Sequence, residues 1–261
     1  MIRIELQGFA NAQQRLDAVA RQLPFATALG LNRLAQQFMR DAKAEMRDSF
    51  RQPTPFTLNS LRQYGLATKD KPVAIVDFKA ALGVGSGVGV TRTADKYLRW
   101  QVYGGERRLK GFERALVARR LMPDGMFAVP GPGAQRDRYG NVKPSQIVAI
   151  LSYFQAFQED GMGWRMNSTE ASRRRMAKGT RTRLGYRYFV GAPGGKAGAL
   201  GIYQDVKIGP GVRELLPVFW YVKTARYEPR LDLDATLAGT VRHHRDRIMA
   251  DALRQALATA R

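Results

Sequence analysis

The chain has 261 residues and carries 43 lysines and arginines against 22 aspartates and glutamates, which gives a formal net charge of +21. It contains no cysteine and only two histidines, which are adjacent, so a disulfide framework, a thiolate metal site, a cysteine nucleophile and a histidine-rich metal site are excluded. The hydrophobic fraction of 44% is enough for a packed core, and the excess of positive charge indicates an acidic partner, which is nucleic acid, an acidic protein or an anionic membrane face.

The N-terminal residues are predicted to form a short strand followed by a helix. Apolar and charged residues alternate over 2–6, which is typical of a half-buried strand. Asn11 is a favourable N-cap for the helix that follows. One face of that helix carries Leu16, Val19 and Leu23. Pro24 is expected to end this helix and to start the next one, because a proline inside a helix removes a backbone hydrogen bond.

The second helix is the strongest local prediction and is expected from about Phe25 to Phe50. Apolar residues recur along it at spacings of three and four, namely Leu31, Leu34, Phe38, Ala42 and Met46. Beyond it the sequence predicts a short helical turn over 57–63 and a strand over 73–78. The glycine-rich stretch 83–89 indicates a loop or the tip of a hairpin, because it lacks the Gly-Lys-Ser/Thr ending of a phosphate-binding loop.

The middle of the chain is expected to contain long irregular segments. Residues 94–122 are predicted to be partly helical, and 123–144 to form an extended excursion with turns. Ser145 is expected to cap a helix that runs to Phe154. The stretch 160–200 is rich in glycine and arginine, which is typical of a loop.

The C-terminal part is predicted to contain strands and one closing helix. The strands are expected at 186–190, 200–203 and 215–222. Asp232 or Asp234 is expected to cap the helix. The buried face of this helix is expected to carry Leu233, Leu237, Val241, Ile248 and Ala252.

These elements together predict an α+β fold in a single domain over 1–261. It has N-terminal amphipathic helices, a central mixed β-sheet with arm or loop insertions at about 80–145 and 160–200, and a C-terminal helix. Loops of this length are usually functional or become ordered against a partner.

Two patterns in the sequence bear on catalysis. Asp77 and Lys79 stand at the end of a predicted strand, and an acid-x-Lys strand end occurs in magnesium-dependent nucleases, in which a second acid, here Asp70, completes the site. The pattern is common by chance, so an ordinary strand end is favoured. His243 and His244 lie in the predicted C-terminal helix, where one imidazole is expected to face the core and the other the solvent. We therefore expect no enzyme activity, no metal and no cofactor.

Positive charge is densest between residues 165 and 187. The candidate contacts for a polyanion or a partner are Arg165, Arg173, Arg174, Arg175, Lys178, Arg181, Arg183 and Arg187. Arginines neutralise phosphates, and Trp164, Tyr186 and Tyr188 can either stack on bases or fill the cores of strands. The alternative is a solvated loop. Because no helix-turn-helix, zinc finger or RNP-type signature is present, binding of nucleic acid is expected to be non-specific.

Several stretches of the sequence resemble phage and prophage morphogenesis proteins. The helix FATALGLNRLA at 25–35 is similar to one near the start of tail-completion proteins of the minor tail protein Z kind. Further phrases of this kind are TPFTLNSL at 54–61, QVYGGER at 101–107, DRYGN at 137–141, PVFW at 217–220 and YEPRLD at 227–232.

This resemblance implies a structural protein of the head–tail junction or tail of a phage virion, assembled in the host cytoplasm. Such proteins form homo-oligomeric rings, here expected to be six-fold, around the DNA channel and contact neighbouring neck and tail proteins. No membrane contact is expected. The candidate intersubunit anchors are Phe112, Met126, Phe127 and Val129, with packing inside the same chain as the alternative. The alternative functions are the Asp77/Lys79 nuclease and a free, non-specific DNA-binding protein.

Overall fold

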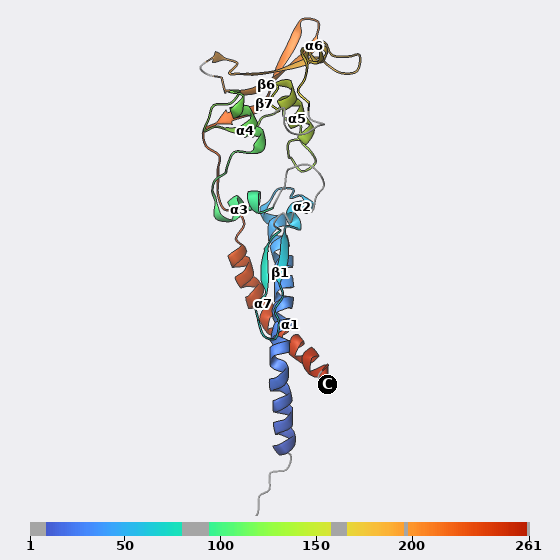
Figure 1. Cartoon of the computed structure of the whole chain (residues 1–261), viewed down its shortest axis with the longest axis vertical. Coiled ribbons are helices and arrows are strands. Elements are labelled where there is room, and N and C mark those ends of the chain that lie inside the picture. Colours follow the sequence, from blue (N-terminus) through green and yellow to red (C-terminus); the bar gives the residue numbers. More distant parts are fainter. Residues whose placement is uncertain (1–8, 80–93, 158–165, 196–197, 260–261) are drawn as a thin grey trace, which may run out of the picture. The chain divides into compact units, whose positions relative to one another are not determined.

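Figure 1 shows the computed structural model, which describes residues 9–79, 94–157, 166–195 and 198–259. The strand expected at 2–6, the glycine-rich stretch 83–89, Trp164 and Arg165 lie outside the described residues. The fold is α+β, as predicted. The chain divides into two compact units: Met1–Tyr103 with Pro229–Arg261 form unit 1, and Gly104–Glu228 form unit 2.

A single long helix, α1 (Phe9–Ser49), opens unit 1, and it replaces the two helices expected on either side of Pro24. The prediction of a break at Pro24 is wrong. The proline removes one backbone hydrogen bond, but Ala26, Ala28 and Gly30 are buried in the turns that follow, and their packing keeps the helix continuous. The predicted core face of the second helix is confirmed at Phe38, Ala42 and Met46.

The C-terminal helix, α7 (Leu233–Ala258), runs antiparallel to α1. Gly30 of α1 faces Met249 and Ala252 near the end of α7. Further along α1, Asp41 accepts a hydrogen bond at 2.6 Å from Oγ1 of Thr240, which lies in the first half of α7. As predicted, Asp232 caps the helix, and its carboxylate accepts the backbone N–H of Ala235. The predicted buried face is confirmed at Ile248 and Ala252.

Leu237 was expected on that buried face, but it is exposed, and Thr240 is buried instead. Thr240 takes this position because its hydroxyl has acceptors in Asp41 and in the backbone carbonyl of Thr236, so a polar residue can be buried there at little cost.

A short hairpin lies along α1. Helix α2 (Pro55–Leu58) is capped by Thr54 and is followed by β1 (Leu61–Gly65), which pairs antiparallel with β2 (Ile75–Phe78). The predicted helical turn over 57–63 is therefore wrong beyond Leu58, because residues 61–63 pair with β2. Asn32 of α1 holds this hairpin in place: its amide oxygen accepts Ala67 N–H at 2.8 Å, and its NH₂ group donates to Ala67 O at 3.0 Å.

Unit 2 is built on an antiparallel sheet in the order β4-β7-β6-β5. Its strands are β4 (Phe127–Pro130), β5 (Tyr186–Gly191), β6 (Gly201–Gly209) and β7 (Val212–Val222). The three strands predicted at 186–222 are confirmed, with longer bounds for β6 and β7. The stretch 123–144, expected to be an extended excursion with turns, contributes β4 to the sheet, because its backbone pairs with β7 over Phe127–Pro130.

Helices α4 (Gly111–Ala118) and α5 (Pro144–Tyr153) supply the remaining core of unit 2. The fully buried residues Leu116, Ile150, Ile202 and Val218 belong to one hydrophobic cluster. Helix α5 begins two residues earlier than predicted, and Lys143 rather than Ser145 is its N-cap. Pro144 suits the first turn because the N–H that it lacks would have no partner there.

Two short connections complete the fold. Helix α3 (Asp95–Tyr103) closes the N-terminal part of unit 1. Strand β3 (Gly105–Glu106) pairs antiparallel with β8 (Arg226–Tyr227), so the first and last residues of unit 2 lie side by side. None of the helices in the described ranges is long and apolar enough to cross a bilayer.

Candidate functional site

The arginine-rich segment contains a helix that was not predicted. Helix α6 spans Glu170–Lys178, and Thr169 is its N-cap, whose hydroxyl accepts Ser172 N–H at 3.2 Å. Gly179 ends it with a φ of +75°, a conformation that favours glycine. A Thr-Glu pair before the arginines and a glycine after them are the signals that sequence reading missed.

The residues after α6 form a turn that is fixed by its backbone. Thr180 N–H donates to Arg183 O at 2.9 Å, and Thr180 Oγ1 accepts Arg183 N–H at 3.1 Å. Gly185 lies so close to Ala177 O that a Cβ there would collide with this carbonyl. Lys207 of β6 donates its backbone N–H to Gly185 O at 2.8 Å, so the turn is also attached to the sheet.

Three of the predicted cationic contacts already have partners within the chain. The guanidinium of Arg173 donates to Ser168 O at 3.1 Å. Arg174 forms an exposed ion pair with Glu170 at 2.5 Å, one helical turn away. Arg187 pairs with Asp205 at 3.3 Å, and Asp205 also binds Arg213 at 2.5 Å. The hydrogen bond and the charge of Arg213, together with Arg187, outweigh desolvation and hold the pKa of Asp205 below its ordinary value.

Within residues 166–187, four exposed cations have no ion-pair partner among the described residues, and we call them the cationic cluster. They are Arg175, Lys178, Arg181 and Arg183. Two lie in the second half of α6 and two in the turn that follows. Because they are close in sequence and their backbone is hydrogen-bonded, their positive charges add up on one small part of unit 2.

The aromatic residues near the cationic cluster mainly serve the core. Tyr188 is buried and makes edge-to-face contacts with Tyr153 and Tyr186, at centroid distances of 5.5 and 5.4 Å. Burial raises the pKa of Tyr188. Burial also raises the pKa of the half-buried Tyr186, against the opposing effect of the nearby Arg183 charge. Tyr188 is therefore not free to stack on a base, so charge dominates at this surface.

The predicted intersubunit anchors lie in unit 2, where their own chain uses most of their surface. Phe112 of α4 contacts Phe219 with ring centroids 5.0 Å apart, and Met126 packs against the same core. The ring of Phe127 lies under the guanidinium of Arg107, 4.8 Å from its centroid. Val129 of β4 is 37% exposed. The intersubunit role of these residues stays a prediction.

Asp77 and Lys79 lie in and just after the exposed strand β2. Asp77 stands opposite Arg62 of β1, and its carboxylate accepts the backbone N–H of Phe78 at 2.6 Å. The backbone N–H of Lys79 donates to Ser60 O at 2.6 Å. Within the described ranges, no three histidine, aspartate or glutamate residues gather in a group that could hold a metal ion. The nuclease alternative stays a prediction.

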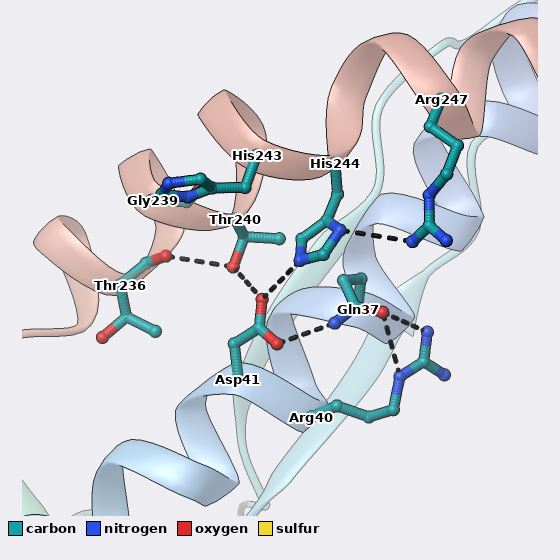
Figure 2. A network of polar contacts seen from close by, with 9 residues as sticks. All are labelled: Gln37, Arg40, Asp41, Thr236, Gly239, Thr240, His243, His244 and Arg247. Carbon is teal, nitrogen blue, oxygen red and sulfur yellow. Dashed lines mark hydrogen bonds and ion pairs between the residues drawn. The ribbon is translucent and has the colours of Figure 1, made fainter.

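One of the two histidines, His244, joins a polar network between α1 and α7 (Figure 2). His244 Nε2 lies 4.0 Å from Asp41 Oδ2, the oxygen that also accepts the hydroxyl of Thr240. Gln37 donates to the other oxygen of Asp41 at 2.7 Å. His243 is exposed on the other side of the helix. One imidazole faces the helix interface and the other the solvent, as predicted, and the network holds two helices together.

Sequence reading missed a buried ion pair in unit 2. Glu113 of α4 is fully buried, and its carboxylate binds the guanidinium of Arg107 through two contacts of 2.6 and 2.5 Å. The same carboxylate accepts the backbone N–H groups of Lys110 at 2.6 Å and Ala128 at 2.9 Å. Burial opposes ionisation of Glu113, but these four hydrogen bonds outweigh it, so the pKa of Glu113 lies below its ordinary value.

Comparison of the chain with protein-family models, with curated proteins and with solved structures finds no match.

Proposed function

We propose that this chain is a structural protein of a tailed-phage virion. In this proposal, identical copies form a ring at the head–tail junction, around the DNA channel, and the cationic cluster of each copy contacts a polyanion. The observation that supports the polyanion contact is the set of four unpaired cations on α6 and the hydrogen-bonded turn that follows it. The resemblance of 25–35, 54–61 and 217–220 to phage morphogenesis proteins supports the place of action.

The physics of this contact favours weak, diffuse binding. Arg175, Lys178, Arg181 and Arg183 carry their charges on exposed, flexible side chains. Contacts of this kind with phosphates are screened by salt and carry no base sequence information. DNA that must move through a channel needs this kind of contact, since tight binding would stop it.

A matched pair of variants tests the role of the cluster. The first replaces all four cluster residues with alanine. The control replaces four other exposed cations, Arg47, Arg51, Arg119 and Arg242, with alanine, so both proteins lose the same charge. Binding to labelled duplex DNA is measured by fluorescence anisotropy between low and moderate salt.

We expect the cluster variant to lose most of the affinity at low salt. If all four cations contact phosphates, the slope of log K against log salt falls by about 3 to 4, whereas it changes less in the control. Equal losses in both variants would mean that only net charge matters, which would contradict the assignment of this surface. Plasmid cleavage that needs Mg²⁺ and is abolished by Asp77→Ala would favour the nuclease alternative.

A further inference from the structure

Helix α1 carries an apolar seam that extends beyond the end of the helix that covers it. Leu16, Val19, Leu23, Ala26 and Gly30 follow one another at alternating spacings of three and four residues. Residues with these spacings line one face of a helix, as in the a and d positions of a coiled coil. We call this face of α1 the seam.

The C-terminal part of the seam is occupied by α7. Ala26 is buried, and Gly30 faces Met249 and Ala252 across the helix interface. Because α7 is antiparallel to α1 and ends at Ala258, it covers the seam only over its later residues. Figure 1 shows the dark blue N-terminal turns of α1 running past the end of α7.

In the N-terminal part of the same seam, the two leucines are exposed and Val19 between them is half-buried. Leu16 is 69% exposed and Leu23 is 48% exposed, although both continue the line on which Ala26 and Gly30 are buried. Moving a leucine side chain out of water lowers the free energy. Two exposed leucines beside an existing helix contact therefore favour the packing of a further helix against them.

The charge of the seam indicates what kind of partner can bind there. The stretch 16–30 carries one aspartate, Asp17, and one arginine, Arg21, so it is neutral in a chain whose net charge is +21. Contact between copies at this stretch therefore adds less local like-charge repulsion than contact between surfaces that carry the excess positive charge.

We propose that the uncovered seam of α1, Leu16 to Leu23, packs antiparallel against the same seam of a second copy of this chain. The pairing continues the helix packing that α7 makes further along α1, and α7 of each copy is already in use on its own seam. This inference goes beyond the proposed function, because a surface that meets its own copy makes a two-fold contact, whereas neighbours in a ring meet through two different surfaces.

Single cysteines test the contact directly, because the chain contains no other thiol. Val19→Cys lies on the seam, and Arg21→Cys lies on the opposite face of the same helix as the matched control. Each full-length variant is treated with a short bis-maleimide at micromolar concentration. We expect a covalent dimer from the Val19→Cys protein and none from the Arg21→Cys protein.

A second pair of variants measures how much the seam contributes. Leu16→Glu with Leu23→Glu places like charges on both facing helices, whereas Arg21→Glu alters charge on the opposite face. Because both leucines are exposed, we expect far-UV circular dichroism to be unchanged. Light scattering after size exclusion should show at least a hundredfold rise in the dissociation constant of the seam contact for the double variant only.

The outcomes separate the two proposals. The proposed contact between seams is wrong if the unmodified chain self-associates but Val19→Cys gives no dimer, or if the double glutamate variant associates as before. The ring proposal stands in either case. If the unmodified chain has a mass of 29.2 kDa at all concentrations and no dimer forms, both proposals are wrong.

Discussion

At the scale of single residues, the Arg107–Glu113 pair is the most consequential polar contact in unit 2. The carboxylate is completely removed from solvent, and all four of its hydrogen bonds come from the segment that joins β3, α4 and β4. A buried charge is stable only while such partners remain. The pair therefore fixes the position of α4 against the start of β4.

Glu113→Gln should destabilise unit 2 by about 3–5 kcal/mol, because it leaves the Arg107 charge buried without a counter-charge. Urea unfolding at pH 7 measures the change. The matched control is Glu170→Gln, which breaks the exposed pair with Arg174 and should cost less than about 1 kcal/mol. Equal effects of the two substitutions would show that the buried pair stabilises the fold no more than the exposed pair does.

The same pair predicts a pH dependence. The pKa of Glu113 is lowered in the folded chain, so its contribution is fully present above the ordinary value of 4.5 and is lost as the pH falls through the lowered pKa. The unfolding free energy of the wild-type chain should therefore decrease below about pH 4.5, and the difference from Glu113→Gln should shrink. A difference that stays constant down to pH 2 would contradict this reading.

Some residue roles could be predicted from the sequence and others could not. Asp232 before an apolar run predicts an N-cap because the cap is local, and the structure confirms it. Arg107 and Glu113 are six residues apart in a stretch with many charges, and nothing in their spacing distinguishes them from surface residues. Their burial depends on β4 and β8, which are distant in the sequence or were not predicted.

At the scale of elements, apolar periodicity located the second half of α1 and the strands β5 to β7. The prediction was wrong at Pro24, because proline ends most helices but tertiary packing keeps this one continuous. Helix α6 was missed because it contains too few apolar residues to show a helical period. Strand β4 was missed because Pro130 and the neighbouring glycines resemble a loop, while its pairing partner lies about ninety residues later.

Gly239→Ala should stabilise α7 by about 0.5–1 kcal/mol. Gly239 lies inside this helix, and a Cβ there would meet no atom within 4 Å, so alanine gains helix propensity without a clash. Thermal unfolding of the full chain measures the gain. Gly201→Ala is the contrasting variant, because its Cβ would collide with Phe219 O between β6 and β7, and it should lower the midpoint. A lower midpoint for Gly239→Ala would contradict the expectation.

At the scale of the whole molecule, unit 2 is a continuous segment inserted into unit 1. Within unit 1, Gln101 O accepts the backbone N–H groups of Arg230 at 2.7 Å and Leu231 at 3.0 Å. Within unit 2, β3 and β8 pair. The chain therefore leaves unit 1 and returns to it at neighbouring points, which sequence composition does not reveal because no linker-like stretch marks the boundary.

Residues 104–228 expressed alone should fold. They contain the complete hydrophobic cluster, the four-stranded sheet and both strands that close the unit. We expect cooperative thermal unfolding and a near-UV circular dichroism signal. The complementary protein, in which a short Gly/Ser linker joins Tyr103 to Pro229, should keep the helical signal of α1 and α7. A non-cooperative melt of the excised segment would show that unit 2 needs unit 1.

The pairing of β3 with β8 has a consequence for how such a chain can diversify. A segment whose two ends meet can be exchanged by recombination for another segment of different length and charge, and the helices outside it need not change. The surface proposed to meet a polyanion lies in the inserted segment and the seam proposed to join two copies lies in α1, so the two can change separately.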